Sequence, residues 1–568
     1  MESQRLILFF VFSFSVFLLL DAWQRDQQPV PSAPAVRDPT EKAAQPAAPT
    51  PVPSEKLAAA PGSVPQQPQR LPEPGMTIRV ETDLLVAHIG TQGGDLRRLE
   101  LKKHRDTLDR NKAFVLFETT PERTYVAQSG LTGGKLPSHR TAFAAERENY
   151  QLAEGAGQLE VRLRAPEADG VQVTKIYRFR RGSYLADVAF EIQNQGAAAM
   201  QPYAYFQLVR DGKPPAGDSA MLPTFTGVAV YTDKDKFQKV TFEEIDKGKI
   251  SYPKNANDGW IAVIQHYFFG AWLPKNGAPR EFYTQRLDGG FYSVGVIVPV
   301  GAIAPGATGS ATVPLYAGPQ EQEKLARIAP GLDLTIDYGW LTIIAVPLFW
   351  VLEWLNRWVG NWGVAIILLT VIIKLLFYPL SAASYRSMAK MKVVAPKMQK
   401  IKDQYGNDRQ RMQQAMMELY KTESINPLGG CMPIVVQIPV FIALYWVLLA
   451  SVELRHAPFM LWIDDLAAPD PWFILPVLMA LTMFVQTWLN PEPPDPVQAK
   501  MMKIMPIVFS VFFFFFPAGL VLYWLINNVL SIAQQWQITR ALEKSTPPRK
   551  NLAPHPSSNT RGKLRGGY

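Results

Sequence analysis

Long apolar segments occur at the beginning of this chain and in its second half. Residues 6–20 form one such segment, and residues 362–380, 433–449 and 472–489 form three more. A membrane-spanning helix needs about 20 predominantly apolar residues, so each of these segments is close to the required length. A fifth segment, residues 501–538, is long enough for two helices.

A turn is expected inside this fifth segment. Pro517 and Gly519 are separated by one residue in the sequence Phe-Pro-Ala-Gly-Leu, and Pro and Gly together favour a turn. Two helices joined by a turn bring the predicted total to six spans, which places both chain termini on the same side of the membrane.

The region between the first span and the others shows a different pattern. Residues 158–164, 171–179 and 186–192 alternate between apolar and polar side chains, and glycine-containing turns separate these runs. Alternation with a period of two is typical of strands that have one buried face. Residues 76–331 are therefore predicted to form a large antiparallel all-β sandwich.

Two further segments have distinctive compositions. The stretch from residue 23 to residue 75 is rich in Pro, Ala and Gln and cannot bury enough apolar surface to fold, so it is predicted to be a tether. Between residues 340 and 362 a Trp recurs at every fourth position from Trp350, opposite charged residues. This spacing indicates an amphipathic helix in the outer membrane interface, and the alternative is an ordinary packed linker helix.

The distribution of charge orients the predicted spans. The formal net charge is +9. Lys and Arg gather in residues 381–426 and after residue 540, whereas residues 451–471 are mainly acidic. The positive-inside rule places the two basic segments in the cytoplasm, together with both termini, and the β-rich region in the periplasm of a bacterial inner membrane. The alternative for residues 6–20 is a cleaved signal peptide, but no small-x-small site follows them.

Motifs for catalysis or energy coupling are missing from the sequence. It contains neither a Walker motif nor an HExxH motif, and its six histidines are scattered. The single cysteine, Cys431, excludes an intramolecular disulfide. We expect no enzymatic activity, no catalytic residue, no nucleotide, no cofactor and no metal.

One charged residue lies within an apolar span. Lys374 has Thr370 and Tyr378 one helical turn to either side. A charge at such depth is costly and usually faces a polar cavity, although a lysine can also extend its ammonium group to the interface. Gln437 and Asn528, on other spans, could line the same groove as Lys374 or form separate hydrogen bonds between helices. Periodicity does not decide between these alternatives.

The predicted cytoplasmic segment 384–422 resembles two amphipathic helices, with Asp408 as a cap for the second. Flexible methionine surfaces accept many apolar partners, so this hairpin is predicted to contact clients or the ribosome. The alternative is that its methionines pack on each other. The candidate contact residues are Met388, Met391, Lys392, Met398, Met412 and Met416.

Several long motifs resemble the YidC membrane protein insertases. They are Asn-Pro-Leu-Gly-Gly-Cys-Met-Pro-Ile-Val-Val-Gln-Ile-Pro-Val-Phe at residues 426–441, Tyr-Pro-Leu from Tyr378, and Phe-Pro-Ala-Gly-Leu-Val-Leu-Tyr at residues 516–523. The resemblance is strong over residues 337–543. The anchor, the tether and the β-rich region match the layout of the Gram-negative, six-span form of this family.

This resemblance implies a membrane insertase and chaperone with a five-helix core around a hydrophilic groove, and a periplasmic β-supersandwich. It also implies a basic groove residue at Lys374, where the family more usually has Arg, and aromatic groove residues at Tyr523 and Trp524, where a second Tyr is familiar at the latter position. The implied partners are nascent membrane proteins, the Sec translocon, the ribosome and targeting factors, and the lipid bilayer. The competing interpretations are a secondary transporter, for which no internal repeat is visible, and an anchored periplasmic assembly module.

The predicted fold class is thus a polytopic α-helical membrane protein with a large periplasmic all-β domain. The expected domains are a signal-anchor helix at residues 1–22, the tether at 23–75, the β-rich domain at 76–331, the interfacial helix at 332–360, the five-helix core at 361–540 with its hairpin at 384–422, and a basic tail at 541–568.

Overall fold

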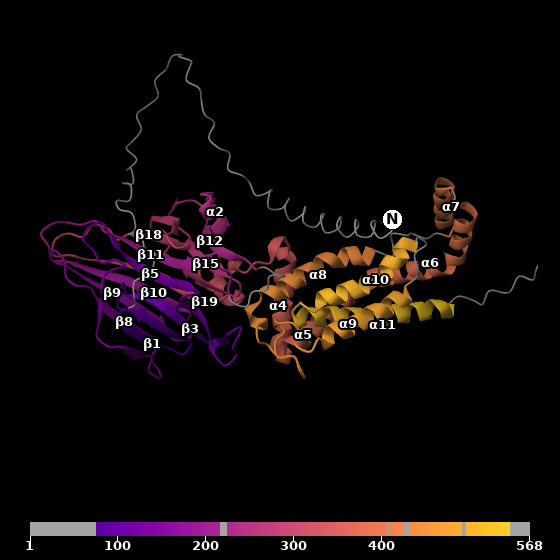
Figure 1. The fold of residues 1–568 in the computed structure, drawn as a ribbon, viewed down its shortest axis with the longest axis horizontal. Helices are drawn as coiled ribbons and strands as arrows, with labels where there is room; N and C mark the ends of the chain where they lie inside the picture. Colours follow the sequence, from indigo (N-terminus) through magenta and orange to yellow (C-terminus); the bar gives the residue numbers. More distant parts are fainter. Residues whose placement is uncertain (1–74, 216–223, 407, 424–431, 491–495, 546–568) are drawn as a thin grey trace, which may run out of the picture. The chain divides into compact units, whose positions relative to one another are not determined.

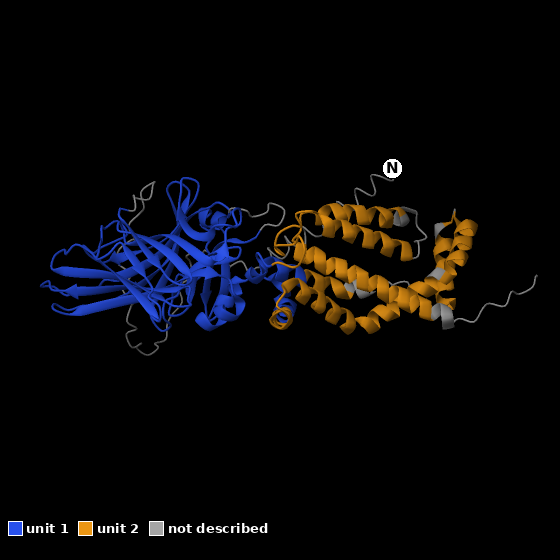
Figure 2. Ribbon diagram, turned by 90° about the horizontal axis from the view of Figure 1, so that it is seen from below, with its two compact units in different colours: residues 1, 3–349, 443–457 blue, residues 2, 350–442, 458–568 orange. Residues whose placement is uncertain are grey.

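The structure is a computed structural model that describes residues 75–215, 224–406, 408–423, 432–490 and 496–545. It divides into two compact units (Figure 2). We call residues 3–349 with 443–457 the β unit, and residues 350–442 with 458–568 the helical unit. The predicted signal anchor, almost all of the tether and most of the basic tail lie outside the described residues.

Two large sheets form the β unit (Figure 1), and among its described strands every pairing is antiparallel except that of β1 with β7. The first sheet has ten strands in the order β14 (Asn255–Ala256), β17 (Arg280–Leu287), β18 (Phe291–Pro299), β11 (Tyr203–Asp211), β5 (Thr124–Thr132), β4 (Ala113–Thr119), β3 (Asp95–Arg105), β2 (Leu85–Gly90), β1 (Thr77–Glu81) and β7 (Asn149–Gln151). The second has nine strands in the order β13 (Lys236–Val240), β12 (Thr226–Thr232), β15 (Trp260–Gln265), β16 (Phe268–Trp272), β19 (Thr308–Pro319), β10 (Leu185–Asn194), β9 (Val171–Arg180), β8 (Gln158–Arg164) and β6 (Ala144–Ala145).

The alternating patterns correctly located the strands of this unit. The run at residues 158–164 is strand β8, and the runs at 171–179 and 186–192 are strands β9 and β10 with one and three residues added, respectively. The inward-facing side chains meet between the two sheets. For example, the ring of Phe206 in β11 lies 6.0 Å from that of Phe190 in β10 and 5.1 Å from that of Trp272 in β16. The prediction of a large all-β domain is confirmed.

A buried ion pair also links the sheets, and sequence analysis did not anticipate it. Lys175 in β9 and Asp95 in β3 have no exposed side-chain surface, and their charged atoms are 3.8 Å apart. The Lys175 ammonium donates to the carbonyl oxygens of Gly93 (3.0 Å) and Ser129 (3.2 Å), and Gln128 donates to Asp95 (2.9 Å). Burial raises the pKa of Asp95 to about 6 and lowers the pKa of Lys175 to about 8.

The end of helix α8 (Met432–Ala450) and the segment that follows it pack within the β unit. The guanidinium of Arg455 lies over the rings of Phe114 and Phe268, at 5.3 and 5.4 Å, and donates to Thr107 Oγ1 at 2.9 Å. His266 Nε2 is 3.2 Å from the carbonyl oxygen of Leu449. Residues 443–457 therefore belong structurally with the strands, although they are far from them in sequence.

The C-terminal half of the chain is helical, and short helices precede it (Figure 1). The helices are α2 (Phe242–Asp246), α3 (Gln322–Ile328), α4 (Thr342–Val359), α5 (Trp362–Leu376), α6 (Tyr378–Tyr405), α7 (Arg409–Thr422), α8 (Met432–Ala450), α9 (Ile474–Leu489), α10 (Pro496–Phe513) and α11 (Ala518–Ser545). Within the part of the chain that the structure describes, short 3-10 helices cover Leu332–Thr335, Gly339–Leu341 and Val452–Leu454.

Local sequence signals explain where several of these helices begin and end. The predicted turn near Pro517 separates α10 from α11. Asp408 caps α7 by accepting a hydrogen bond from the backbone N–H of Arg411, as expected. The predicted span at residues 362–380 is wrong at its end, because α5 stops at Leu376 and α6 starts at Tyr378, with a bend of 66°. Pro379 explains this boundary, since proline favours the first turn of a new helix.

For the described residues, which do not include the predicted first span, length and composition support fewer spans than the five predicted there. Among the described residues one helix, Gly339–Val359, is both long enough and apolar enough to cross a membrane. The bent pair α5–α6 would add another if it is a single span. The apolar helices at Val436–Ala450 and Ile474–Leu489 are shorter. The span count and the interfacial position of α4 remain predictions.

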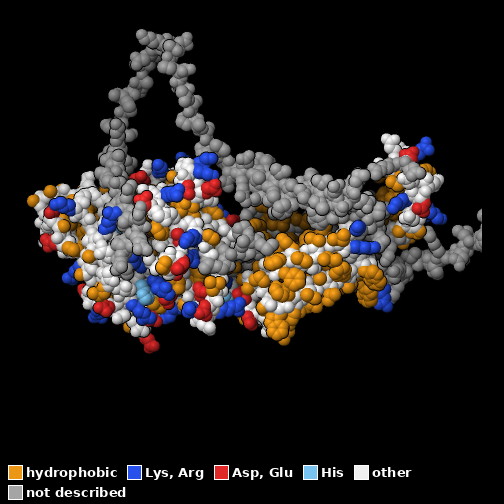
Figure 3. Space-filling model, viewed as in Figure 1, with side chains coloured by type: hydrophobic (Ala, Val, Ile, Leu, Met, Phe, Trp, Pro, Cys, Tyr) orange, Lys and Arg blue, Asp and Glu red, His pale blue; other side chains and the backbone are white. Residues whose placement is uncertain are grey.

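Surface composition distinguishes the helical unit from the β unit. The face of the helical unit drawn in Figure 3 is largely apolar, whereas charged side chains cover much of the visible face of the β unit. Along α9, for example, Val477, Leu481 and Trp488 are exposed. Such contiguous apolar surface marks an interaction with lipid or protein.

Candidate functional site

Lys374 lies at a junction of three helices in the helical unit. Its side chain in α5 is 6% exposed, and its ammonium donates to Ser531 Oγ of α11 at 2.7 Å. Ser531 in turn donates to the carbonyl oxygen of Asn527 at 2.7 Å, and Tyr385 of α6 also hydrogen-bonds with Ser531. The ammonium thus contacts a neutral hydroxyl.

A second group of polar side chains continues from Asn527. Gln437 in α8 donates to Asn527 Oδ1 at 2.9 Å, and Gln437 also hydrogen-bonds with Tyr523. Asn527 therefore links the two groups, because its carbonyl oxygen accepts from Ser531 and its side chain accepts from Gln437. We call the chain Lys374–Ser531–Asn527–Gln437–Tyr523 the polar relay.

Aromatic rings adjoin this end of the polar relay. The ring of Phe441 lies 6.1 Å from that of Tyr523 and 4.2 Å, edge to face, from that of Trp524. Trp524 also lies 5.2 Å from Phe513 of α10. The relay therefore runs from a buried cation to an aromatic cluster.

Three of the predicted groove residues do not belong to the polar relay. Thr370 is 1% exposed, but its hydroxyl donates to the Ile366 carbonyl oxygen of its own helix at 2.7 Å. Tyr378 opens α6, beyond the bend, so a polar stripe along one helix does not continue to it. Asn528 is buried against α9, where it donates to Thr482 Oγ1 at 3.4 Å.

Sequence analysis missed Ser531 and Tyr385. Ser531 lies one helical turn after Asn527 in α11, and Gln535 lies one turn after Ser531. This i, i+4 spacing of polar residues in an apolar helix was the signal that could have revealed Ser531. No comparable local pattern identifies Tyr385, whose contact depends on how α6 packs on α11.

The methionines of the hairpin pack mainly on one another. Met398 and Val394 of α6 are buried in a cluster that also includes Met391, Met416, Leu419 and Tyr420. Met388 and Met412 are partly buried, and the side chain of Lys392 lies outside the described residues. Exposed apolar surface remains at Val393 and Met417. The alternative interpretation, that these methionines form a core of their own, is confirmed for Met391, Met398 and Met416.

Known proteins resemble the chain over almost its whole length. Residues 77–351 match the model of the YidC periplasmic domain, and residues 354–545 match the 60Kd inner membrane protein model. A membrane protein insertase YidC from Nitrosospira multiformis is 58% identical over 562 residues, which cover 96% of this chain and 98% of that protein. Its counterpart in Methylobacillus flagellatus is 56% identical over 554 residues, which cover 97% of this chain and 100% of that protein.

A crystal structure of an active YidC insertase aligns with this chain at 18% identity and a TM-score of 0.38. The alignment covers 81% of this chain and 92% of the chain in that structure. A galactose mutarotase related enzyme from Lactobacillus acidophilus aligns at 12% identity and a TM-score of 0.29. The alignment covers 43% of this chain and 97% of the chain of that enzyme.

Proposed function

This chain belongs to the YidC family of membrane protein insertases, and we propose that it moves the polar segments of its clients past the polar relay around Lys374. It is an inner-membrane insertase with a periplasmic domain, and nascent membrane proteins are its substrates. The observation that carries the proposal is the hydrogen bond of the Lys374 ammonium to a neutral hydroxyl. A carboxylate is a stronger acceptor than a hydroxyl for an ammonium donor.

The physical obstacle to insertion is desolvation. A charged side chain at the bilayer centre costs about 2.5–3.5 kcal/mol on translocon-insertion scales and more in simulations. Polar groups that reach into the helical unit shorten the path over which a client's polar segment loses its contacts with water. An acidic residue of the client can replace Ser531 as the partner of Lys374 and be held there transiently.

Release follows as the client's own apolar helix enters lipid. Its burial stabilises the inserted state by roughly 25 cal/mol per Å² of apolar surface. The membrane potential adds about 2.3 kcal/mol per charge for each 100 mV when acidic groups cross toward the positive outer side. These two contributions supply the driving force without nucleotide hydrolysis.

Crosslinking of a stalled nascent client tests this route. We expect p-benzoylphenylalanine in place of Trp524, beside the polar relay, to crosslink the client when the polar segment is in transit. The same substitution at Trp488, which is 83% exposed on α9, is the matched control and should crosslink mainly lipid. Equal client yields at both positions, or none at Trp524, would refute a route along the relay.

We also propose a topology of six spans with both termini in the cytoplasm, five of the spans forming the core. The support is the clustering of Lys and Arg in residues 381–426 and after residue 540. In a Cys431→Ser background, Ser558→Cys should resist an impermeant maleimide in intact spheroplasts and react after lysis. Labelling in intact spheroplasts would contradict the even number of spans.

The chain is proposed to act both alone and beside the Sec translocon. The hairpin and the basic tail are proposed to contact the ribosome and targeting factors. Exposed cations such as Lys397 and Arg411, at 50% and 75% side-chain exposure, support an electrostatic contact with RNA. Ribosome co-sedimentation should therefore fall steeply between 50 and 200 mM salt. Removal of residues 546–568 should weaken it, and unchanged binding at low salt would mean that the tail's charges serve only topology.

A further inference from the structure

The connection between strands β3 and β4 carries a basic surface that the insertion mechanism does not use. The pairing of these strands shifts register between Leu101 and Arg105, which interrupts the alternation of buried and exposed side chains. Two consecutive lysines are exposed as a result. We call residues 102–112 the basic hairpin. Its exposed cations are Lys102, Lys103, Arg105, Arg110 and Lys112.

Both aspartates of the basic hairpin are engaged within its own turn. Asp106 Oδ1 accepts hydrogen bonds from the backbone N–H groups of Leu108 at 2.9 Å and Asp109 at 3.0 Å. The carboxylate of Asp109 forms an ion pair with Lys112 at 3.1 Å. The two carboxylates therefore shape the turn, and they offset only part of the charge of the five cations.

The remaining cations are available to an external partner. Within the part of the chain that the structure describes, Lys103 and Arg105 form no ion pair. Burial, followed by the positive charge of Arg455, lowers the pKa of His104 to about 4. A cation from a distant segment thus lies close to the basic hairpin, and the surface has an excess of positive charge.

The turn of the basic hairpin lies beside the end of an apolar helix. Thr107 Oγ1 accepts a hydrogen bond from Arg455, which follows Ala450, the last residue of α8, by five positions. Five residues of chain reach at most about 18 Å. The proposed topology makes α8 a span that ends at the outer surface of the bilayer. The basic hairpin is therefore close to that surface.

An apolar side chain projects from the same turn. Leu108, next to Thr107, is 77% exposed. A single exposed leucine is ordinary on a soluble surface. This one stands among cations and next to the residue that contacts the segment after α8. Attraction of cations to anionic lipids, together with burial of an apolar side chain, is the combination that binds a protein surface to the bilayer interface.

We propose that the basic hairpin docks on anionic phospholipid headgroups of the outer leaflet, with Leu108 inserted below them. The inference rests on the proposed topology, in which α8 is a span, but not on the route along the polar relay. A docked hairpin holds the β unit at the surface where the translocated segments of clients emerge. It also limits the rotation of the β unit about the end of α8.

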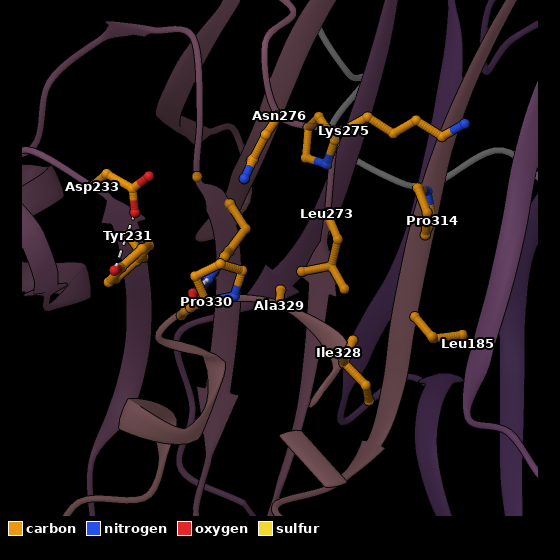
Figure 4. A pocket seen from close by; sticks show the side chains of 13 residues that line it. Leu185, Tyr231, Asp233, Leu273, Lys275, Asn276, Pro314, Ile328, Ala329 and Pro330 are labelled. Atoms are coloured by element: carbon orange, nitrogen blue, oxygen red, sulfur yellow. Dashed lines mark hydrogen bonds between the residues drawn. The ribbon is translucent and has the colours of Figure 1, made fainter. Parts of the chain in front are cut away.

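Fluorescence quenching on the full chain in nanodiscs tests this proposal. A nitrobenzoxadiazole label on Asn111→Cys, in a Cys431→Ser background, reports on the basic hairpin, and phosphatidylcholine with a nitroxide headgroup is the quencher. The matched control label is on Asn276→Cys, an exposed position after the end of β16 that is opposite to Phe268 (Figure 4). In discs that contain phosphatidylglycerol, quenching should be at least fivefold stronger at Asn111 than at Asn276.

Neutralisation of charge separates docking from mere proximity to α8. Lys103→Gln with Arg105→Gln should reduce the quenching at Asn111 at least threefold. Discs of phosphatidylcholine alone should have the same effect, as should about 1 M salt, where the Debye length is about 3 Å. Lys275→Gln is the matched control, because Lys275 is an exposed cation beside Asn276 (Figure 4), and it should change nothing.

Two results would overturn the proposal. One is quenching at Asn111 that is no stronger than at Asn276. The other is strong quenching at Asn111 that depends neither on phosphatidylglycerol nor on Lys103 and Arg105, because the position of the turn beside α8, or a contact with protein, would then explain it. No client is present in these discs, so failure of the route along the polar relay leaves the result unchanged.

Discussion

Replacement of Lys374 by Glu is expected to abolish insertion of clients whose translocated segment is acidic. The new carboxylate would repel the same groups that the ammonium attracts. Lys374→Ala should slow these clients by about tenfold to a hundredfold, because hydrogen bonds to charged groups contribute about 1.5–3 kcal/mol and 1.4 kcal/mol corresponds to a factor of ten. The measurement is protease protection of an acidic client in proteoliposomes, as an initial rate.

Two controls separate charge from structure. Lys374→Arg keeps the charge and should retain most of the activity. Ser531→Ala removes the hydroxyl that the ammonium contacts but leaves the charge in place, so its effect should be less than threefold. Clients with neutral translocated segments should be inserted at similar rates by all variants except Lys374→Glu. Normal insertion of acidic clients by Lys374→Ala would instead identify Lys374 as an anchor at the membrane interface.

Replacement of Lys175 by Met is expected to destabilise the β unit by about 3–5 kcal/mol. The substitution removes the ion-pair partner of a fully buried carboxylate, so that of the two cations that lower the pKa of Asp95 only Arg97 remains, and removal of one partner of a buried ion pair has this cost. The double variant Lys175→Met with Asp95→Asn should recover to within about 1 kcal/mol of the unaltered chain, since replacing both partners is often neutral. Chemical denaturation with hydrogen exchange at β3 and β9 measures the free energy of unfolding locally.

The pH dependence of Lys175→Met has a predictable sign. The pKa of Asp95 is already raised to about 6 in the folded chain, and loss of the positive charge raises it further. Between the ordinary pKa of 3.8 and this raised value the folded state binds more protons than the unfolded state, so stability falls as the pH rises. The loss in the free energy of unfolding of Lys175→Met, relative to the unaltered chain, should therefore be small near pH 4 and largest near pH 8. A deficit that is equal at both values would rule out Asp95 as its source.

Local sequence patterns predicted much of the secondary structure. Alternation located strands β8, β9 and β10, the Pro517 and Gly519 pair separated α10 from α11, and Asp408 capped α7. These features depend on backbone geometry and hydrogen bonds within a few residues, which are encoded in adjacent side chains. The break after Leu376 was also encoded locally, at Pro379, but the apolar run around it obscured the signal.

Contacts between distant segments required the tertiary structure. The alternation in β9 places Lys175 on the same face as Val173 and Tyr177, so the sequence alone indicates an inward-facing lysine. Its partner Asp95 precedes it by 80 residues, and only the packing of the two sheets brings these residues together. Lys374 was likewise identifiable as a charge in an apolar helix, whereas its contact with Ser531 depends on how α5 packs against α11. The sequence by itself therefore indicated that Lys175 and Lys374 lie on buried faces, and the tertiary structure decided which groups they meet, because a burial pattern is local and a partner is not.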